Sequence, residues 1–169
     1  AGLEKSASLM SSVGIGLVNL IFTMIGMSLI DKVGRKKLIY IGSIGYIISL
    51  SLIAMAFYLE WQGFAVPLFL FLFIASHAIG QGAVIWVFIS EIFPNHLRAS
   101  GQAFGSSVHW LLAASIPAMI PYLFNTIGAS TVFMIFALMM VGQLVFVWRM
   151  MPETKGVSLE ELEKQLINR

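Results

Sequence analysis

Apolar residues in this chain are gathered into long runs, separated by short polar connections. No Asp, Glu, Lys or Arg occurs in residues 6–30, 38–59, 61–90 and 99–148. A helix that crosses a bilayer needs about 20 apolar residues, so each of the first three runs predicts one span. The fourth run is too long for one crossing, and Pro121 and Gly128 mark a turn inside it. The pattern predicts five spans, at about 9–30, 38–58, 65–90, 100–123 and 130–150.

The composition agrees with a membrane protein. Hydrophobic residues make up 59% of the chain and charged residues 11%, whereas soluble domains carry about a quarter charged residues. We therefore expect an all-α integral membrane protein. The net charge of +2 is too small to suggest a nucleic-acid partner, and the absence of Cys excludes disulfides and thiolate metal sites. Because the chain lacks an initiator Met and a signal peptide, we expect it to be a fragment of a longer protein.

Basic residues are distributed unequally between the two sets of connections. Residues 31–37 hold four Lys or Arg, residues 91–98 hold one, and the segment from Arg149 onward holds four of the ten. The opposite connections, 59–64 and 124–129, hold none. Basic loops remain in the cytoplasm. This asymmetry predicts that the chain starts outside and ends in the cytoplasm, with residues 151–169 forming a cytoplasmic tail.

Small and polar residues form a stripe on the first span. Its members follow each other at steps of three and four positions: Ser12, Gly16, Asn19, Thr23 and Gly26. Close helix packing explains the Ser and Gly members. Asn19 has an amide to satisfy near the middle of the bilayer, so packing and a cavity-facing role both remain open for it. The second span has only Gly42, Gly45 and Ser49 on one face, which indicates packing alone.

The third span combines helix-loosening residues with polar and aromatic ones. Gly80 and Gly82 flank Gln81, so we expect a local helix defect, which membranes tolerate only where protein or a watery cavity satisfies the backbone. Trp86 belongs either to the interfacial aromatic belt or to the wall of a cavity that fits a sugar ring. His77 is interpreted as a hydrogen-bonded packing residue rather than a ligand.

The last two spans differ in polarity. His109 and Trp110 lie next to each other deep in the fourth span, and we expect His109 to be neutral and to face a wet cavity. The fifth span has Gln143 as its polar interruption and is expected to face lipid. Glu91 and His96 lie at one membrane edge without a nucleophile, so no catalytic site is indicated. We expect no enzyme activity, no cofactor and no metal site.

Three sequence motifs lie at the predicted cytoplasmic ends of the spans. They are DKVGRKKL (31–38), WVFISEIFPNHLRASG (86–101) and PETKG (152–156). Together they resemble the sugar-porter family of the major facilitator superfamily, in the same order and spacing. The resemblance implies that these five spans are helices eight to twelve of a twelve-helix transporter, in its carboxy-terminal half. It also implies a plasma-membrane location.

The resemblance implies roles for individual residues in substrate binding. The family's sugar-binding Asn on helix eight matches Asn19, and its helix-ten Trp matches Trp86. Its amide–Trp pair on helix eleven matches His109 and Trp110, with His in place of the amide. A proline-rich stretch of the family is GQGAVIW here, where Gln81 is expected to supply a polar group.

The same resemblance implies a cytoplasmic gate. Five charged residues are expected to form a network that holds one access state closed: Asp31, Arg35, Glu91, Arg98 and Glu153. The tail adds a capping box at Ser158–Glu161, followed by a short amphipathic helix with Leu159, Leu162 and Leu166 on one face.

The leading hypothesis is a carrier that moves a monosaccharide or polyol by alternating access, with H⁺ coupling left open. Its partners are the substrate, the lipid bilayer and the missing amino-terminal half. One alternative is an organic-ion carrier of the same superfamily. The spans carry no buried countercharge, which favours a neutral substrate. The other alternative is a non-transporting membrane sugar sensor.

Overall fold

The chain forms a bundle of long helices in the computed structural model, which describes residues 5–158, 160–162 and 164. The elements are α1 (Lys5–Val33), α2 (Arg35–Tyr58), α3 (Ala65–His77), η1 (Ala78–Gly82), α4 (Val84–Ile92), α5 (Arg98–Ile127) and α6 (Ala129–Arg149). Helices are the expected form, because they satisfy their own backbone groups where lipid offers no hydrogen bonds. Among the described residues, five stretches are long and apolar enough to cross a membrane, with α3, η1 and α4 forming one of them. The predicted number of five membrane-length apolar stretches is confirmed.

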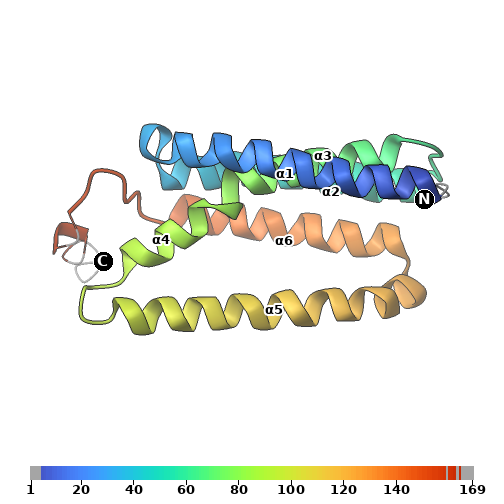
Figure 1. The fold of residues 1–169 in the computed structure, drawn as a ribbon. Coiled ribbons are helices and arrows are strands. Elements are labelled where there is room, and N and C mark those ends of the chain that lie inside the picture. Colours follow the sequence, from blue (N-terminus) through green and yellow to red (C-terminus); the bar gives the residue numbers. More distant parts are fainter. Residues whose placement is uncertain (1–4, 159, 163, 165–169) are drawn as a thin grey trace.

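The connections divide between the two ends of the bundle. Figure 1 shows the α1–α2 turn, the α4–α5 connection and the segment after α6 at one end of the molecule. The α2–α3 and α5–α6 connections lie at the opposite end. The three basic segments of the sequence therefore share one end, as a positive-inside arrangement requires.

Helix α2 lies at the centre of the packing and contacts α1, α3, η1, α4 and α6. Its contact with α6 is extensive and includes a hydrogen bond of 2.8 Å from the Ser130 hydroxyl to the Ala54 carbonyl. Val132, Ala137 and Val147 of α6 are buried. The fifth span was expected to face lipid; one face of α6 packs along α2, whereas most of the helix is exposed in this structure.

A π-helical turn, η1, interrupts the third span at Ala78–Gly82. The local defect predicted from Gly80 and Gly82 takes this form. A Cβ added to Gly80 would lie 2.6 Å from the Cα of Gly42 on α2, so the two backbones touch here and neither position has room for a side chain. The widened turn is therefore held directly against α2, with protein rather than lipid around its backbone.

Helix α5 extends beyond its predicted end and packs little against the rest of the described chain. It continues through Pro117 and Pro121 to Ile127, and the turn falls at Gly128, whose φ of 82° suits glycine. Gly101 is its one buried residue. Figure 1 shows α5 standing apart from α6 along most of its length.

Candidate functional site

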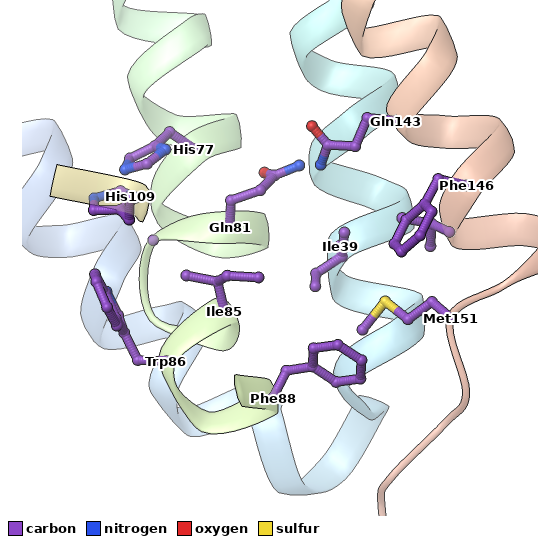
Figure 2. Close-up of a pocket in the computed structure, with 12 residues that line it drawn as sticks. Ile39, His77, Gln81, Ile85, Trp86, Phe88, His109, Gln143, Phe146 and Met151 are labelled. Atoms are coloured by element: carbon purple, nitrogen blue, oxygen red, sulfur yellow. The ribbon is translucent and has the colours of Figure 1, made fainter. Parts of the chain in front are cut away.

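A cavity of about 400 Å³ lies where α2, η1, α4, α5 and α6 converge. This volume is in the range of small-molecule sites, roughly 300–1,000 Å³. Figure 2 shows the side chains that line it, with polar groups on one part of the wall and aromatic or aliphatic groups on the rest. Its polar side chains are His77, Gln81, His109 and Gln143, and its aromatic side chains are Trp86, Phe88 and Phe146.

Aromatic rings and an imidazole form one wall of the cavity. The Trp86 and His109 rings meet edge to face, with centroids 5.0 Å apart and an interplanar angle of 76°. His109 makes a second edge contact with Trp110 at 5.4 Å and 82°. The Trp86–His109 contact joins α4 to α5, because Trp86 lies near the start of α4 and His109 lies in the middle of α5. The wall thus offers an apolar face beside a group that can donate and accept hydrogen bonds.

Two side-chain amides form hydrogen bonds to one hydroxyl at the opposite wall of the cavity. Gln81 and Gln143 each donate an N–H to Ser43 Oγ, at 3.2 and 3.3 Å. Figure 2 shows Gln81 extending from η1 toward Gln143 on α6. Ser43 is fully buried and donates its own proton to the Ile39 carbonyl at 2.8 Å. The oxygen of Gln81 is buried without a hydrogen-bond partner among the described residues. This junction fixes η1 to α2 and α6.

The structure gathers three of the five predicted substrate-binding residues into this cavity: Trp86, His109 and Gln81. Asn19 and Trp110 do not line it and have exposed side chains. The stripe on α1 that contains Asn19 is not a continuous packing surface. Gly26 packs against η1, whereas a Cβ added to Gly16 would have no neighbour within 4 Å.

Sequence reasoning missed two residues of the cavity wall. His77 is predicted to be a hydrogen-bonded packing residue, and it does hydrogen-bond with Tyr46, but it also lines the cavity. Gln143, predicted to lie on a lipid-facing helix, lines the cavity as well. The spacing of His77 and Gln81, four positions apart, was a usable signal, because such residues share a helix face. No comparable signal marked Gln143, since its position depends on how α6 packs against α2.

A charge cluster lies at the end of the bundle that carries the basic connections. Arg35 donates to both oxygens of the Glu91 carboxylate, from Nη2 to Oε1 at 2.7 Å and from Nε to Oε2 at 3.1 Å. Its Nη1 lies 3.0 Å from Asp31 Oδ1. The side chains of Arg35 and Glu91 are 10% and 24% exposed, whereas that of Asp31 is 83% exposed. The bidentate, mostly buried pair is therefore the strong one, and the Asp31 pair is a surface contact.

Glu153 joins this cluster through the backbone. Its carboxylate accepts the amide hydrogens of Arg35 at 2.9 Å and Lys36 at 3.2 Å, at the start of α2. A carboxylate in this place satisfies free N–H groups and the positive end of the helix dipole. Thr154 then donates its hydroxyl to Glu91 Oε2 at 2.5 Å. The PETKG segment thus connects α2 and α4.

The start of α2 also requires a glycine. Gly34 has φ 100° and ψ 158°, a conformation that is essentially restricted to glycine. A Cβ at this position would lie 2.6 Å from Glu153 Oε2. The glycine of the DKVGRKK string therefore permits both the turn and the approach of the carboxylate.

Arg98 is predicted to belong to the charge cluster, but among the described residues the structure shows no ion pair for it. Within the described residues its Nε and Nη2 atoms are buried and have no hydrogen-bond partner. It lines a smaller cavity of about 250 Å³ together with Glu91, whose carboxylate is occupied by Arg35 and Thr154. The Glu91 carboxylate oxygens instead accept hydrogen bonds from Arg35 and Thr154.

The tail follows the charge cluster. Ser158 Oγ accepts the amide hydrogen of Glu161 at 3.3 Å, as one half of the predicted capping box. Leu162 is buried, whereas Leu159 and Leu166 lie outside the described residues. In the part of the chain that the structure describes, no group of three or more His, Cys, Asp or Glu is placed to hold a metal ion.

Comparisons with known proteins point to one family. The family described as sugar (and other) transporter matches residues 1–166. The arabinose-proton symporter of Bacillus subtilis is 39% identical over 96% of this chain and 35% of the symporter. The D-xylose-proton symporter of Escherichia coli is 33% identical over 96% of this chain and 34% of its own length. The chain thus spans about a third of these relatives.

Solved structures give the same result. The major facilitator superfamily proton:xylose symporter XylE, bound to 6-bromo-6-deoxy-D-glucose, superposes with a TM-score of 0.86 at 32% identity. The match covers 97% of this chain and 36% of that structure. The inward open conformation of XylE from E. coli gives a TM-score of 0.87 at 33% identity, over 94% of this chain and 36% of that one. With the all-helical bundle and the family match along nearly its whole length, this chain belongs to the sugar (and other) transporter family.

Proposed function

We propose that this chain is the carboxy-terminal part of a twelve-helix carrier, comprising helices eight to twelve, that moves a monosaccharide or polyol across a membrane. The relatives named as arabinose-proton and D-xylose-proton symporters support this proposal. In this proposal a second helical half, absent from the chain, completes the cavity wall, and alternating access exposes the substrate to each side in turn. We call the proposed full-length protein the parent transporter.

The composition of the cavity wall carries the proposal. Among the residues that line the 400 Å³ cavity, none is Asp, Glu, Lys or Arg. An organic ion held near mid-membrane needs a countercharge, because an unpaired charge there is costly. A neutral polyhydroxy compound needs flat apolar faces and several hydrogen-bonding groups, and Trp86, His109 and Gln143 supply these. A sugar or polyol therefore fits the wall better than an ion does.

Flux measurements on the parent transporter in proteoliposomes test the proposal. We expect saturable uptake of at least one sugar from a panel of pentoses, hexoses and polyols. Uptake that is accelerated by an inward H⁺ gradient identifies a symporter, as in the named relatives, and uptake indifferent to it identifies facilitated diffusion. Sugar binding without flux contradicts the carrier and indicates a sensor. Flux of organic ions alone contradicts the neutral substrate.

We further propose that the charge cluster of Asp31, Arg35, Glu91 and Glu153 is a cytoplasmic gate element. The bidentate Arg35–Glu91 pair and the Glu153 cap hold α2, α4 and the tail together in this structure. Loosening this connection shifts the balance between access states, and none of the four charged residues lines the cavity. Glu91→Gln in the parent transporter should alter the transport rate or the inward/outward bias while leaving the order of sugar preference unchanged. A changed order of preference contradicts this division of roles.

The proposed sidedness places the charge cluster in the cytoplasm and the α2–α3 connection outside, in the plasma membrane. This chain contains no Cys, so single cysteines introduced at Gln62 and Lys155 can report the topology in a cysteine-free parent transporter. A membrane-impermeant maleimide added to intact cells should label position 62 and not position 155. The opposite pattern reverses the proposed orientation.

A further inference from the structure

A buried tyrosine beside the cavity contacts one of the two cavity imidazoles. Tyr46 on α2 is 7% exposed, and its hydroxyl makes a hydrogen bond with His77 Nδ1. Its ring packs on Phe73, with centroids 4.9 Å apart. The aromatic ring is therefore held by packing, and the hydroxyl has a single hydrogen-bond partner among the described residues.

The direction of this hydrogen bond follows from what else the hydroxyl can reach. If His77 Nδ1 carried the proton and donated it, the Tyr46 hydroxyl hydrogen would be left buried without an acceptor. An unsatisfied polar group costs about 1–3 kcal/mol, and lipid offers no water to replace the acceptor. Tyr46 therefore donates to Nδ1. A neutral imidazole that accepts at Nδ1 carries its proton on Nε2.

The Nε2 edge of the ring is the one that can meet a ligand. His77 lines the 400 Å³ cavity together with His109 and Trp86. Nε2 lies on the side of Gly82, where an added Cβ would be 3.6 Å away, so no side chain covers it there. Within the described residues Nε2 has no hydrogen-bond partner, and it is not among their fully buried unsatisfied atoms.

The other polar side chains of the cavity differ from His77 in how their hydrogen-bond donors are held. One N–H of the Gln81 amide and one N–H of the Gln143 amide already donate to Ser43. His109 is exposed, and no hydrogen bond holds its ring in one tautomer among the described residues. The Nε2–H of His77 is thus a cavity donor whose identity and direction are set by a second residue, Tyr46.

We propose that His77 is a specificity-determining residue that donates a hydrogen bond from Nε2 to one substrate oxygen, and that Tyr46 is its positioning residue. This inference rests on the proposed function, because it concerns the same cavity and a neutral polyhydroxy substrate. It adds a rule for selectivity: a sugar that lacks the hydroxyl facing His77 leaves this donor unpaired.

The test compares two isosteric changes in the parent transporter. His77→Asn places an amide near the Nδ1 position, which keeps a partner for Tyr46 but removes the donor at Nε2. His77→Gln reaches the Nε2 position and keeps a donor there. Binding of the transported sugar and of its monodeoxy analogues is measured for each protein. For the unchanged transporter, we expect one analogue to bind about tenfold more weakly than the transported sugar, because the analogue loses one hydrogen bond.

The weaker binding of this analogue relative to the transported sugar, its discrimination, should disappear in His77→Asn and persist in His77→Gln. Tyr46→Phe keeps the ring packing on Phe73 and should reduce the discrimination against the same analogue by several-fold, raising KM and leaving kcat unchanged. If Tyr46 had only a structural role, Tyr46→Phe would weaken the binding of all analogues equally. If His77→Asn does not fold, Tyr46→Phe alone decides the question.

The outcomes separate this inference from the proposed function. Unchanged discrimination in His77→Asn and Tyr46→Phe, with sugar binding intact, overturns the role of His77 and leaves the sugar carrier standing. No sugar binding by the unchanged transporter overturns the proposed function itself.

Discussion

The two carboxylates around Arg35 provide a sharp test of what burial contributes to an ion pair. Both lie about equally close to the guanidinium, at 2.7 Å for Glu91 and 3.0 Å for Asp31. They differ in exposure, 24% against 83%, and in geometry, because only Glu91 is bidentate. Glu91→Gln and Asp31→Asn each remove one negative charge with little change in shape.

The expected magnitudes follow from this difference. Removing one partner of a fully buried pair costs about 3–5 kcal/mol. Glu91 keeps about a quarter of its side chain exposed and Asp31 remains beside Arg35, so we expect Glu91→Gln to lower the free energy of unfolding by about 2–3 kcal/mol. An exposed pair contributes about 0.2–1 kcal/mol, so Asp31→Asn should cost less than about 1 kcal/mol.

Double-mutant cycles with Arg35→Gln isolate each pair. The free energy of unfolding is measured by SDS titration in mixed micelles, with the parent transporter as the protein. The Arg35–Glu91 coupling should be about 2 kcal/mol and the Arg35–Asp31 coupling about 0.5 kcal/mol or less. Equal couplings for both pairs, or none for Arg35–Glu91, would falsify the reasoning from burial and bidentate geometry.

Three further changes probe other features of the structure. Gly34→Ala should lower the free energy of unfolding by about 1–3 kcal/mol in the same SDS titration, because φ is 100° and the methyl group would meet Glu153. Ser43→Ala leaves two amide donors without their acceptor and should cost about 1–3 kcal/mol. Trp86→Ala removes an aromatic face of the cavity and should raise the KM for sugar uptake by about tenfold.

Each of these changes has a matched control. Gly142→Ala alters a helical glycine with no neighbour within 4 Å and should not destabilise the protein. Ser49→Ala removes a hydroxyl that bonds only its own helix backbone, so it should cost less than Ser43→Ala. Trp148→Ala alters a Trp outside the cavity and should leave KM unchanged. A control that behaves like its partner contradicts the corresponding assignment.

The sequence predicted the number of spans well because charge-free runs of membrane length have few other interpretations. It predicted the end of α5 less well. Pro121 predicts a turn, but the helix continues to Ile127, since neighbouring groups can compensate for a proline inside a membrane helix. Gly128, with its positive φ, was the better marker of the end.

The site was only partly predictable, for a reason that depends on packing. Trp86 and His109 are polar or amphipathic residues in apolar runs, which draws attention from sequence alone. Gln143 reaches the cavity because α6 packs along α2, and no local pattern encodes that contact. Arg98 shows the converse: its motif position suggests an ion pair, but the Glu91 carboxylate is already shared by Arg35 and Thr154.

Helix α4 is short, and it carries residues of both the cavity and the charge cluster. Trp86 and Glu91 belong to the same nine-residue helix, roughly 7.5 Å apart along its axis at 1.5 Å per residue. The π turn precedes this helix and extended backbone at Phe93 follows it, so the regular α-helix is interrupted at both ends. We therefore expect an occupant that displaces Trp86 to displace the Glu91 carboxylate from Arg35 as well. Because such coupling is reciprocal, a change that weakens the ion pair must alter the affinity of the cavity by the same factor by which occupancy alters the pair.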